Sequence, residues 1–331
     1  MPTVYITQED TALKKKGERL VVKKGKERIA DIPLIKVDQV VVFGEASISG
    51  ALVSLLSKAE VPITYLSYYG KYKGRLVPKY SKNSLLRIEQ FTTSQKKDLR
   101  LKFSRQIVKG KLKNMRTLLM RTTRGNRSSK EKEVCDKLKN VIDKLDRTKK
   151  IDKLRGFEGL GSRYYFSQFD SMLKGDFEFN GRNRRPPRDP INCLLSFGYS
   201  LLLNEVLTGL YLVGFDPYIG FFHSNQYGKP ALALDLMEEF RPVVIDSVVK
   251  TMVNKNMVVR SDFKEVCGTI KMKEKVRNKF LEQYEKRLRN KFTHPIFEYE
   301  VSWRRCIELQ ARLISKFINK EIEEYHPMVV K

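Results

Sequence analysis

The sequence predicts an α+β protein with a β-sandwich-like N-terminal domain over residues 1–80 and a larger all-α domain over residues 81–331. Two observations predict this division. The first eighty residues contain short runs rich in β-branched residues, whereas most of the later chain has apolar residues at helical spacing. Between the two regions Gly70, Gly74 and Pro78 interrupt both patterns, and we expect the domain boundary between Pro78 and Asn83.

Five runs in the N-terminal domain are typical of strands, and charged or glycine turns separate most of them. They are TVYIT (3–7), RLVVKK (19–24), RIADIPLI (28–35), VDQVVVFG (37–44) and VPITYLS (61–67). A short helical stretch, SGALVSLLSKAE (49–60), precedes the last run. The apolar–polar alternation is imperfect, so the sequence predicts strands here but not their register.

Helical spacing dominates from residue 84 onward. Leu99, Phe103 and Ile107 recur every four residues, and similar spacing continues to Leu119. Residues 91–130 contain thirteen Lys or Arg and a single acid, Asp98. Such a stretch forms either a solvated helix face or a nucleic-acid-binding surface, and its concentration of charge favours the second.

The composition limits the classes of partner. The chain has 331 residues, with 65 Lys and Arg against 38 Asp and Glu, and a formal net charge of +27. Such a basic chain repels itself, so a polyanionic partner explains the charge. Nucleic acid is the expected partner, and an anionic membrane surface is the weaker alternative. The sequence contains no run of about 18 consecutive apolar residues, which a membrane-spanning helix would need, and no signal-peptide pattern. We therefore expect a cytoplasmic protein without membrane association.

The cysteines and histidines differ in what they indicate. The four cysteines are scattered and form no CxxC pair, which argues against a zinc site. His294 and His326 each precede a proline in a turn-like context, and we expect both to be surface or structural residues. His223 instead follows a glycine-punctuated apolar segment and precedes a polar turn. It is therefore the histidine best placed for chemistry.

The helix expected after this turn, ALALDLMEEF (231–240), carries acids on a mostly apolar surface. Buried acids need partners, and the acids concerned are Asp235, Glu238 and Glu239. A divalent cation is one possible partner, and the basic residues Lys229 and Arg241 are another. Composition alone leaves both possibilities open.

Glu158 is a second candidate for chemistry. It lies in LRGFEGLGSRYYF (154–166), where glycines at 156, 159 and 161 permit close backbone approach. On its own, Glu158 either contributes to a site or caps the helix that follows.

Three ordered motifs resemble the CRISPR-associated integrase family, the universal spacer-acquisition enzyme of CRISPR adaptation. The motifs are RGFEGLGSRYYF (155–166), FNGRNRRPPRDPINCLLSFGYSLLLNEV (179–206) and GFFHSNQYGKPALALDLMEEFRP (220–242). The resemblance implies that Glu158, His223 and Glu238 are catalytic and bind Mg²⁺ or Mn²⁺. It also implies that Asp235, and with it Lys229, either orients the site or contacts DNA.

The resemblance further implies an activity. It is a metal-dependent DNA endonuclease and integrase that inserts short DNA fragments into a CRISPR array by 3′-OH transesterification. The implied partners are double-stranded DNA (spacer precursor and repeat), a second copy of the chain bound through the β-rich end, and the small second CRISPR adaptation protein. The alternatives are a standalone structure-specific nuclease on branched DNA and a non-catalytic DNA-binding scaffold.

The second motif contains a proline-bounded loop, GRNRRPPRDP (181–190), with four arginines. Guanidinium groups grip phosphates with a rigid fork of donors. The alternative is a solvated loop whose arginines contact acids of their own fold. Because the loop lies between two candidate catalytic motifs, we expect DNA binding by Arg182, Arg184, Arg185 and Arg188.

Overall fold

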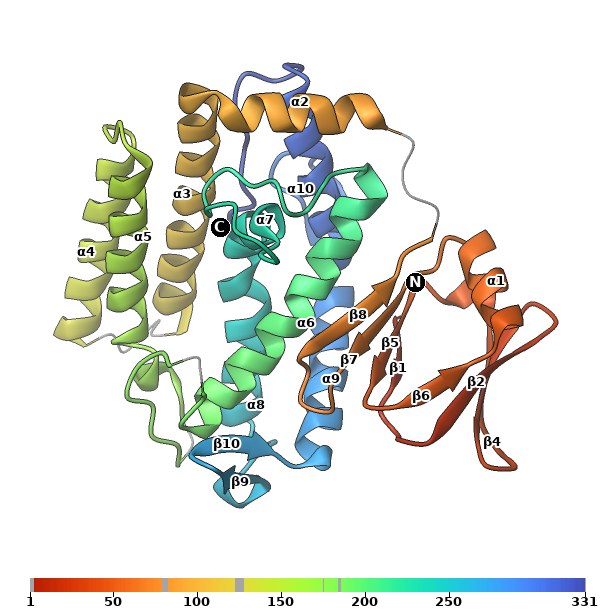
Figure 1. Cartoon of the computed structure of the whole chain (residues 1–331). Helices are drawn as coiled ribbons and strands as arrows, with labels where there is room; N and C mark the ends of the chain where they lie inside the picture. Colours follow the sequence, from red (N-terminus) through yellow and green to blue (C-terminus); the bar gives the residue numbers. More distant parts are fainter. Residues whose placement is uncertain (1–2, 79–82, 123–127, 175, 184–185, 331) are drawn as a thin grey trace. The chain divides into compact units, whose positions relative to one another are not determined.

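The computed structural model describes residues 3–78, 83–122, 128–174, 176–183 and 186–330. The chain divides into two compact units, residues 1–81 and 82–331, shown in Figure 1. The predicted boundary at Pro78 to Asn83 falls mostly on residues 79–82, which lie outside the described part of the chain. The predicted α+β class, with strands first and helices after them, is confirmed.

The first unit contains two four-stranded sheets. The first has the order β1-β5-β7-β8, in which β1, β5 and β7 are parallel and β8 is antiparallel. The second has the order β4-β3-β2-β6. Their bounds are β1 Thr3–Ile6, β2 Thr11–Lys16, β3 Arg19–Lys24, β4 Glu27–Pro33, β5 Gln39–Phe43, β6 Ala46–Ile48, β7 Ile63–Leu66 and β8 Tyr72–Leu76.

One hydrophobic core serves both sheets of this unit. Leu20 and Val22 of β3 contribute to the same cluster as Val40 and Val42 of β5. Helix α1 (Gly50–Lys58) adds Leu52, and all five residues of β5 are buried. A single core shared by both sheets is compatible with a β-sandwich, but the sandwich-like arrangement itself stays a prediction.

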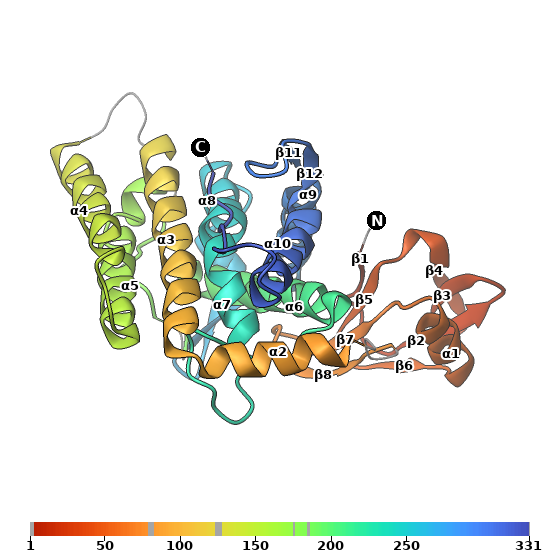
Figure 2. The same cartoon turned by 90° about the horizontal axis from the view of Figure 1, so that it is seen from above.

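The second unit is mainly helical. Its long helices are α2 Ser84–Gln95, α3 Lys97–Thr122, α4 Ser129–Leu145, α5 Ile151–Phe166, α6 Pro190–Val213, α7 Ala231–Phe240, α8 Ser247–Asn254, α9 Glu274–Arg289 and α10 Trp303–Ile318. Helix α3 lies between α7 on one side and the pair α4 and α5 on the other, as Figure 2 shows. Because α3 is covered on both sides, part of its basic sequence is buried.

The prediction of an all-α second domain is wrong in one respect. Two short hairpins interrupt the helices, one formed by β9 (Phe263–Val266) and β10 (Thr269–Met272), the other by β11 (Lys291–Thr293) and β12 (Glu300–Ser302). In the first hairpin Cys267 and Gly268 both have positive φ, as a two-residue turn of this kind requires.

Local signals explain where α6 begins and ends. The Asp189 carboxylate accepts the N–H of Asn192, Pro190 occupies the first turn, and Gly214 ends the helix at φ 105°. Helix α6 is long and apolar enough to cross a membrane by length and composition. However, 78% of its most apolar window is buried inside the fold, as in a core helix.

Helix α7 continues into a π-helical turn, Arg241–Asp246, before α8 begins. Pro242 has no N–H to continue the α-helical ladder, which explains the change at this point. π-Turns inside helices are frequent at functional sites, and this one follows Glu238 by three residues.

The C-terminal residues 321–330 pack behind α7 without regular structure. The buried Glu239 carboxylate accepts hydrogen bonds from Tyr325 Oη at 2.7 Å and from Met328 N at 2.7 Å. Asn114 of α3 donates to both Glu239 O and Met328 O. Burial raises the pKa of Glu239 to about 8, although its three hydrogen-bond donors act in the opposite direction. The buried Glu239 and Asn114 therefore hold this segment together.

We expect Glu239→Gln to change the pH dependence of stability. The folded-state pKa of Glu239 is raised, so the stability linked to its protonation is complete below about pH 4.5 and is lost as pH rises through about 8. The variant lacks this titration. Urea unfolding at pH 5, 6.5 and 8 should show wild-type stability falling relative to the variant by about 1 kcal/mol per pH unit or more. A constant difference across this range would contradict the assignment.

Candidate active site

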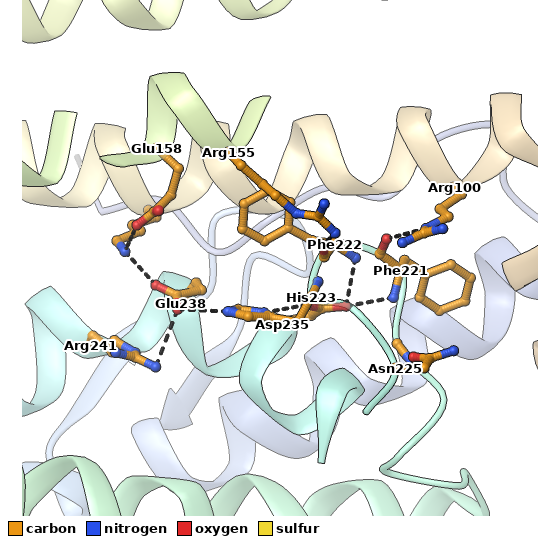
Figure 3. A network of polar contacts seen from close by, with 12 residues as sticks. Arg100, Arg155, Glu158, Phe221, Phe222, His223, Asn225, Asp235, Glu238 and Arg241 are labelled. Carbon is orange, nitrogen blue, oxygen red and sulfur yellow. Dashed lines mark hydrogen bonds and ion pairs between the residues drawn. The ribbon is translucent and has the colours of Figure 1, made fainter. Parts of the chain in front are cut away.

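The Asp235 carboxylate organises the segment that carries His223 (Figure 3). Its Oδ2 accepts the backbone N–H groups of Phe221 at 2.7 Å and Phe222 at 3.0 Å. Its Oδ1 accepts the N–H of His223 at 2.8 Å and faces His223 Nδ1 at 2.7 Å. Because a carboxylate only accepts, Nδ1 carries the proton and Nε2 presents its lone pair. Asp235 thereby fixes both the position and the tautomer of the imidazole.

Other residues hold the same segment from outside. Arg100 of α3 donates to Phe221 O at 2.6 Å, and Arg155 of α5 donates to Phe222 O at 3.0 Å. At Gly220 a Cβ would lie 2.6 Å from Ala231 Cβ and 2.7 Å from its backbone carbon. Only glycine allows the segment to cross so close to the start of α7.

Glu158 and Glu238, which lie close to His223 in Figure 3, both pair with the ammonium group of Lys111. Lys111 Nζ of α3 lies 2.6 Å from Glu238 Oε2 of α7 and also forms an ion pair with Glu158 of α5. Ser162 Oγ, one turn after Glu158, donates to Glu158 Oε1 at 2.9 Å. The side chain of Lys111 is only 4% exposed. Three helices thus direct one cation and two acids at the same point.

Glu238 stays ionised although it is buried. Burial alone would raise its pKa, but the charges of Arg241 and Lys111 act in the opposite direction, and the pKa is lowered to about 2. Arg241 lies 3.2 Å from Glu238 Oε1, and His223 Nε2 lies 3.8 Å from the same oxygen. The acid is therefore a carboxylate throughout the physiological pH range.

The donor set suits a hard divalent cation. Two carboxylates and one imidazole are ligands that Mg²⁺ and Mn²⁺ accept. Lys111 forms an ion pair with Glu238 Oε2, but the geometry of this contact is not that of a hydrogen bond. This buried oxygen therefore has no hydrogen-bond partner in the described part of the chain. Among the described residues, no three His, Cys, Asp or Glu side chains already surround a metal position. Lys111 instead supplies the positive charge between the acids.

A second buried acid supports this site from behind. Asp246 accepts hydrogen bonds from Tyr165 Oη at 2.9 Å and Tyr199 Oη at 2.6 Å. Burial raises its pKa to about 6, although both hydroxyl groups lower it. The Arg241 guanidinium lies 4.9 Å from the Tyr199 ring centroid. The cluster links the π-turn to α5 and α6 and holds Arg241 against Glu238.

The remaining predicted residues have different surroundings. Asp235 is fully buried, which fits orientation of the site and leaves no surface for DNA. Lys229 lies in the turn before α7, where its N–H donates to Gln226 O, and no ion pair among the described residues joins it to the acids of the site. Arg182 donates to Asn192 and Ser196 of its own fold. Arg188 is exposed, while Arg184 and Arg185 lie outside the described residues.

Lys111 was not among the predicted site residues, because the sequence places it simply within the basic stretch 91–130. The helical pattern contains a signal, since Lys111 lies between Gly110 and Leu112 and four residues after the buried Ile107. A lysine at a buried helical position needs an acid. Arg241 was considered only as an alternative to a metal, whereas it contacts Glu238 together with the other site residues.

Comparisons with known proteins agree on one family. The sequence profile of the family described as CRISPR associated protein Cas1 matches residues 4–286. The chain is 36% identical over 330 residues to a CRISPR-associated endonuclease Cas1 of Thermus thermophilus, covering 99% of this chain and 97% of that protein. It is also 36% identical over 337 residues to a Cas4/Cas1 fusion of Geobacter sulfurreducens. This second match covers 99% of this chain but only 60% of the fusion protein.

The fold matches solved structures as well. A Cas1 protein from Thermotoga maritima is 27% identical and superposes with a TM-score of 0.83 over 96% of this chain and 97% of that one. A casposase solved with its integration product has a TM-score of 0.85 over 100% of this chain and 95% of that one. At 21% identity the casposase shows likeness of fold alone.

We expect Asp235→Asn to destabilise the protein by about 2–4 kcal/mol. The amide nitrogen of asparagine cannot accept a hydrogen bond, so some of the backbone N–H groups that now donate to Asp235 would be left buried without an acceptor. Urea unfolding at neutral pH measures the change. Asp152→Asn is the matched control, since that carboxylate is 89% exposed and pairs with Arg155; it should alter stability by less than about 1 kcal/mol. Equal stability of the two variants would refute the organising role of Asp235.

Proposed function

The chain belongs to the Cas1 family of CRISPR-associated proteins, and from this premise we propose that it is a divalent-metal-dependent DNA endonuclease and integrase. In this proposal it inserts short DNA fragments as new spacers into a CRISPR array, with the 3′-OH of a fragment attacking the backbone of the repeat. One phosphorus–oxygen bond forms as another breaks, so no energy-rich cofactor is needed. The curated relatives reported above are named as endonucleases.

One observation carries this proposal: Glu158 and Glu238 share the charge of a single buried lysine, and His223 Nε2 lies 3.8 Å from Glu238 Oε1. Two acids beside an oriented imidazole form a donor set for a cation, and a strongly lowered pKa such as that of Glu238 is typical of functional sites. We assign Glu158, His223 and Glu238 as ligands of Mg²⁺ or Mn²⁺, and the imidazole makes Mn²⁺ especially suitable. Lys111 is then the competitor of the divalent ion for both carboxylates.

The residues of the chain would divide the work as follows. Asp235 keeps the proton on His223 Nδ1, so that Nε2 remains available as a ligand atom. Arg241 and Lys111 keep Glu238 ionised, and Ser162 orients Glu158. When bound, the divalent ion supplies Lewis-acid polarisation of the phosphodiester and stabilises charge on the attacking and leaving oxygens. The chain itself positions the strands through its positive charge.

The proposal includes partners. We propose double-stranded DNA as both spacer precursor and target repeat, supported by the net charge of +27. The shared fold of a casposase solved with its integration product supports strand joining. Family membership supports a homodimer through the β-rich end and assembly with the small second CRISPR adaptation protein. Of the loop arginines, Arg188 is exposed and remains proposed for DNA binding, whereas Arg182 serves the loop itself.

The test of function uses a short duplex with 3′-OH ends and a plasmid carrying a CRISPR repeat, with Mg²⁺, Mn²⁺ or a chelator. Joined products that require a divalent ion support an integrase. Cut ends without joined products point to a nuclease on branched DNA. Binding without either product, unaffected by chelation, points to a non-catalytic scaffold.

We expect His223→Ala to abolish cutting and joining while DNA affinity stays nearly unchanged. A loss of at least about 100-fold, or about 2.7 kcal/mol of transition-state stabilisation, is expected. DNA binding relies on many Lys and Arg side chains, so one imidazole hardly affects it. The control is His326→Ala, an exposed histidine that should remain active. A folded His223→Ala protein that processes DNA at the wild-type rate would remove His223 from the mechanism.

We expect Lys111→Met to lower stability by about 3–5 kcal/mol in a chelator, because the buried Glu238 and the half-buried Glu158 carboxylates lose their shared counter-charge. Added Mn²⁺ should then raise the melting temperature of the variant more than that of the wild type, since the competing ammonium is gone. Lys109→Met is the matched control on the same helix. Its pair with the half-exposed Asp146 should contribute less than about 1 kcal/mol and show no Mn²⁺ effect. Mn²⁺ shifts that are the same in Lys111→Met and the wild type would argue against the proposed ligands.

A further inference from the structure

A basic cavity with a volume of about 880 Å³ lies in the second unit, outside the candidate active site. It is bounded by the end of α3, the π-turn and α8, the end of α9 and the β11–β12 hairpin, which lie on one side of the second unit in Figure 2. Four cations line it, Arg121, Lys250, Arg287 and Lys291, against a single acid, Glu298.

Two of these cations have only neutral partners. Lys250 Nζ donates to Thr122 Oγ1 at 2.9 Å. Arg287 donates through Nε and Nη2 to Val243 O at 2.8 and 2.5 Å, and its guanidinium lies 4.9 Å from the Trp303 ring centroid. No ion pair joins either side chain to a carboxylate among the described residues. Both keep N–H donors beyond those that these bonds use.

The cations also disfavour one another. Burial, together with the charge of Arg121, lowers the pKa of Arg287 to about 10. Burial likewise lowers the pKa of Lys250, with the charge of Arg287 acting in the same direction. Lys291 differs because its ammonium is exposed and pairs with Glu300. Lys250 and Arg287 therefore lower the stability of the free protein, since partly buried charges without a carboxylate partner among the described residues are unfavourable.

We propose that this cavity, the basic pocket, binds a phosphate group through Arg121, Lys250 and Arg287. A phosphate supplies the missing negative charge and several acceptor oxygens, and a guanidinium with a nearby ammonium is a matching donor set. The volume is within the range of small-ligand sites, so one nucleotide unit fits.

The position of the basic pocket identifies the source of the phosphate as a DNA strand. Leu118, which lines it, lies two turns beyond Lys111 on α3, a rise of about 10 Å. Val243 of its wall follows Glu238 by five residues. A strand reacting at the candidate active site thus has neighbouring phosphates within reach of the basic pocket. This assignment of the source rests on the proposed function, whereas phosphate binding itself does not.

The test compares Lys250→Gln with Lys279→Gln in a chelator. Lys279 is similarly half-buried and donates to one neutral acceptor, Met257 O, but lies outside the basic pocket. Melting temperatures are measured in inorganic phosphate and in sodium chloride of equal ionic strength. DNA affinity is measured across salt concentrations. Arg121→Gln serves as a second variant, because Arg121 is exposed and its loss should not affect folding.

We expect phosphate to raise the melting temperature of the wild type and Lys279→Gln but not of Lys250→Gln or Arg121→Gln. Without phosphate, Lys250→Gln should melt at or above the wild-type temperature, because it removes an unneutralised charge. Its slope of log affinity against log salt should fall by about 1 relative to Lys279→Gln.

Three results would overturn the proposal or part of it. An equal phosphate shift in Lys250→Gln and wild type would exclude the basic pocket. A melting temperature several degrees below wild type would mean that Lys250 is structural. Loss of the phosphate shift with an unchanged salt slope would replace the DNA strand by a free phosphate or nucleotide as the ligand. Because no divalent ion is present, these outcomes are independent of whether the chain joins DNA.

Discussion

The four contacts of the Asp235 carboxylate are the interaction on which the candidate active site depends. They fix three consecutive backbone N–H groups and the imidazole of His223 with a single side chain. Since residues 221–223 have no helix or strand to hold them, the carboxylate replaces the missing ladder of backbone bonds. Gly220 and the arginines of α3 and α5 complete this arrangement. A single carboxylate therefore restrains both the backbone and the ring of His223.

Several buried ionisable groups lie on α7 and in the π-turn that follows it. Three acids among them lie within nine residues of sequence but have different environments: Glu238, Glu239 and Asp246. Cations keep Glu238 ionised, whereas burial raises the pKa of the other two acids. Adjacent residues can differ in this way because Glu238 faces Lys111 and Glu239 faces the C-terminal segment. One helix thus separates a reactive face from a structural one.

Much of the fold follows from local sequence, and the remainder from contacts that no local pattern contains. The run VDQVVVFG predicts β5 because a central strand is buried on both faces, and the spacing of Leu99, Phe103 and Ile107 predicts α3. Strand β2 was missed because its TALKKK sequence ends in three exposed lysines. The ordered motifs identified the family and proposed Glu158, His223 and Glu238. They could not identify Lys111, whose partners lie 47 and 127 residues away.

A lysine between two acids has a consequence for how the chain matures. In a site made only of acids and an imidazole, the carboxylates would repel each other in the absence of a metal ion. Folding of such a chain would therefore require metal binding. The tethered ammonium removes that dependence, and the newly made chain can reach its native form in ion-poor surroundings. On the proposed ligand assignment, the same ammonium weakens ion capture through competition. The protein would then load reversibly from an abundant pool, and it would not retain the first scarce ion that it met during synthesis.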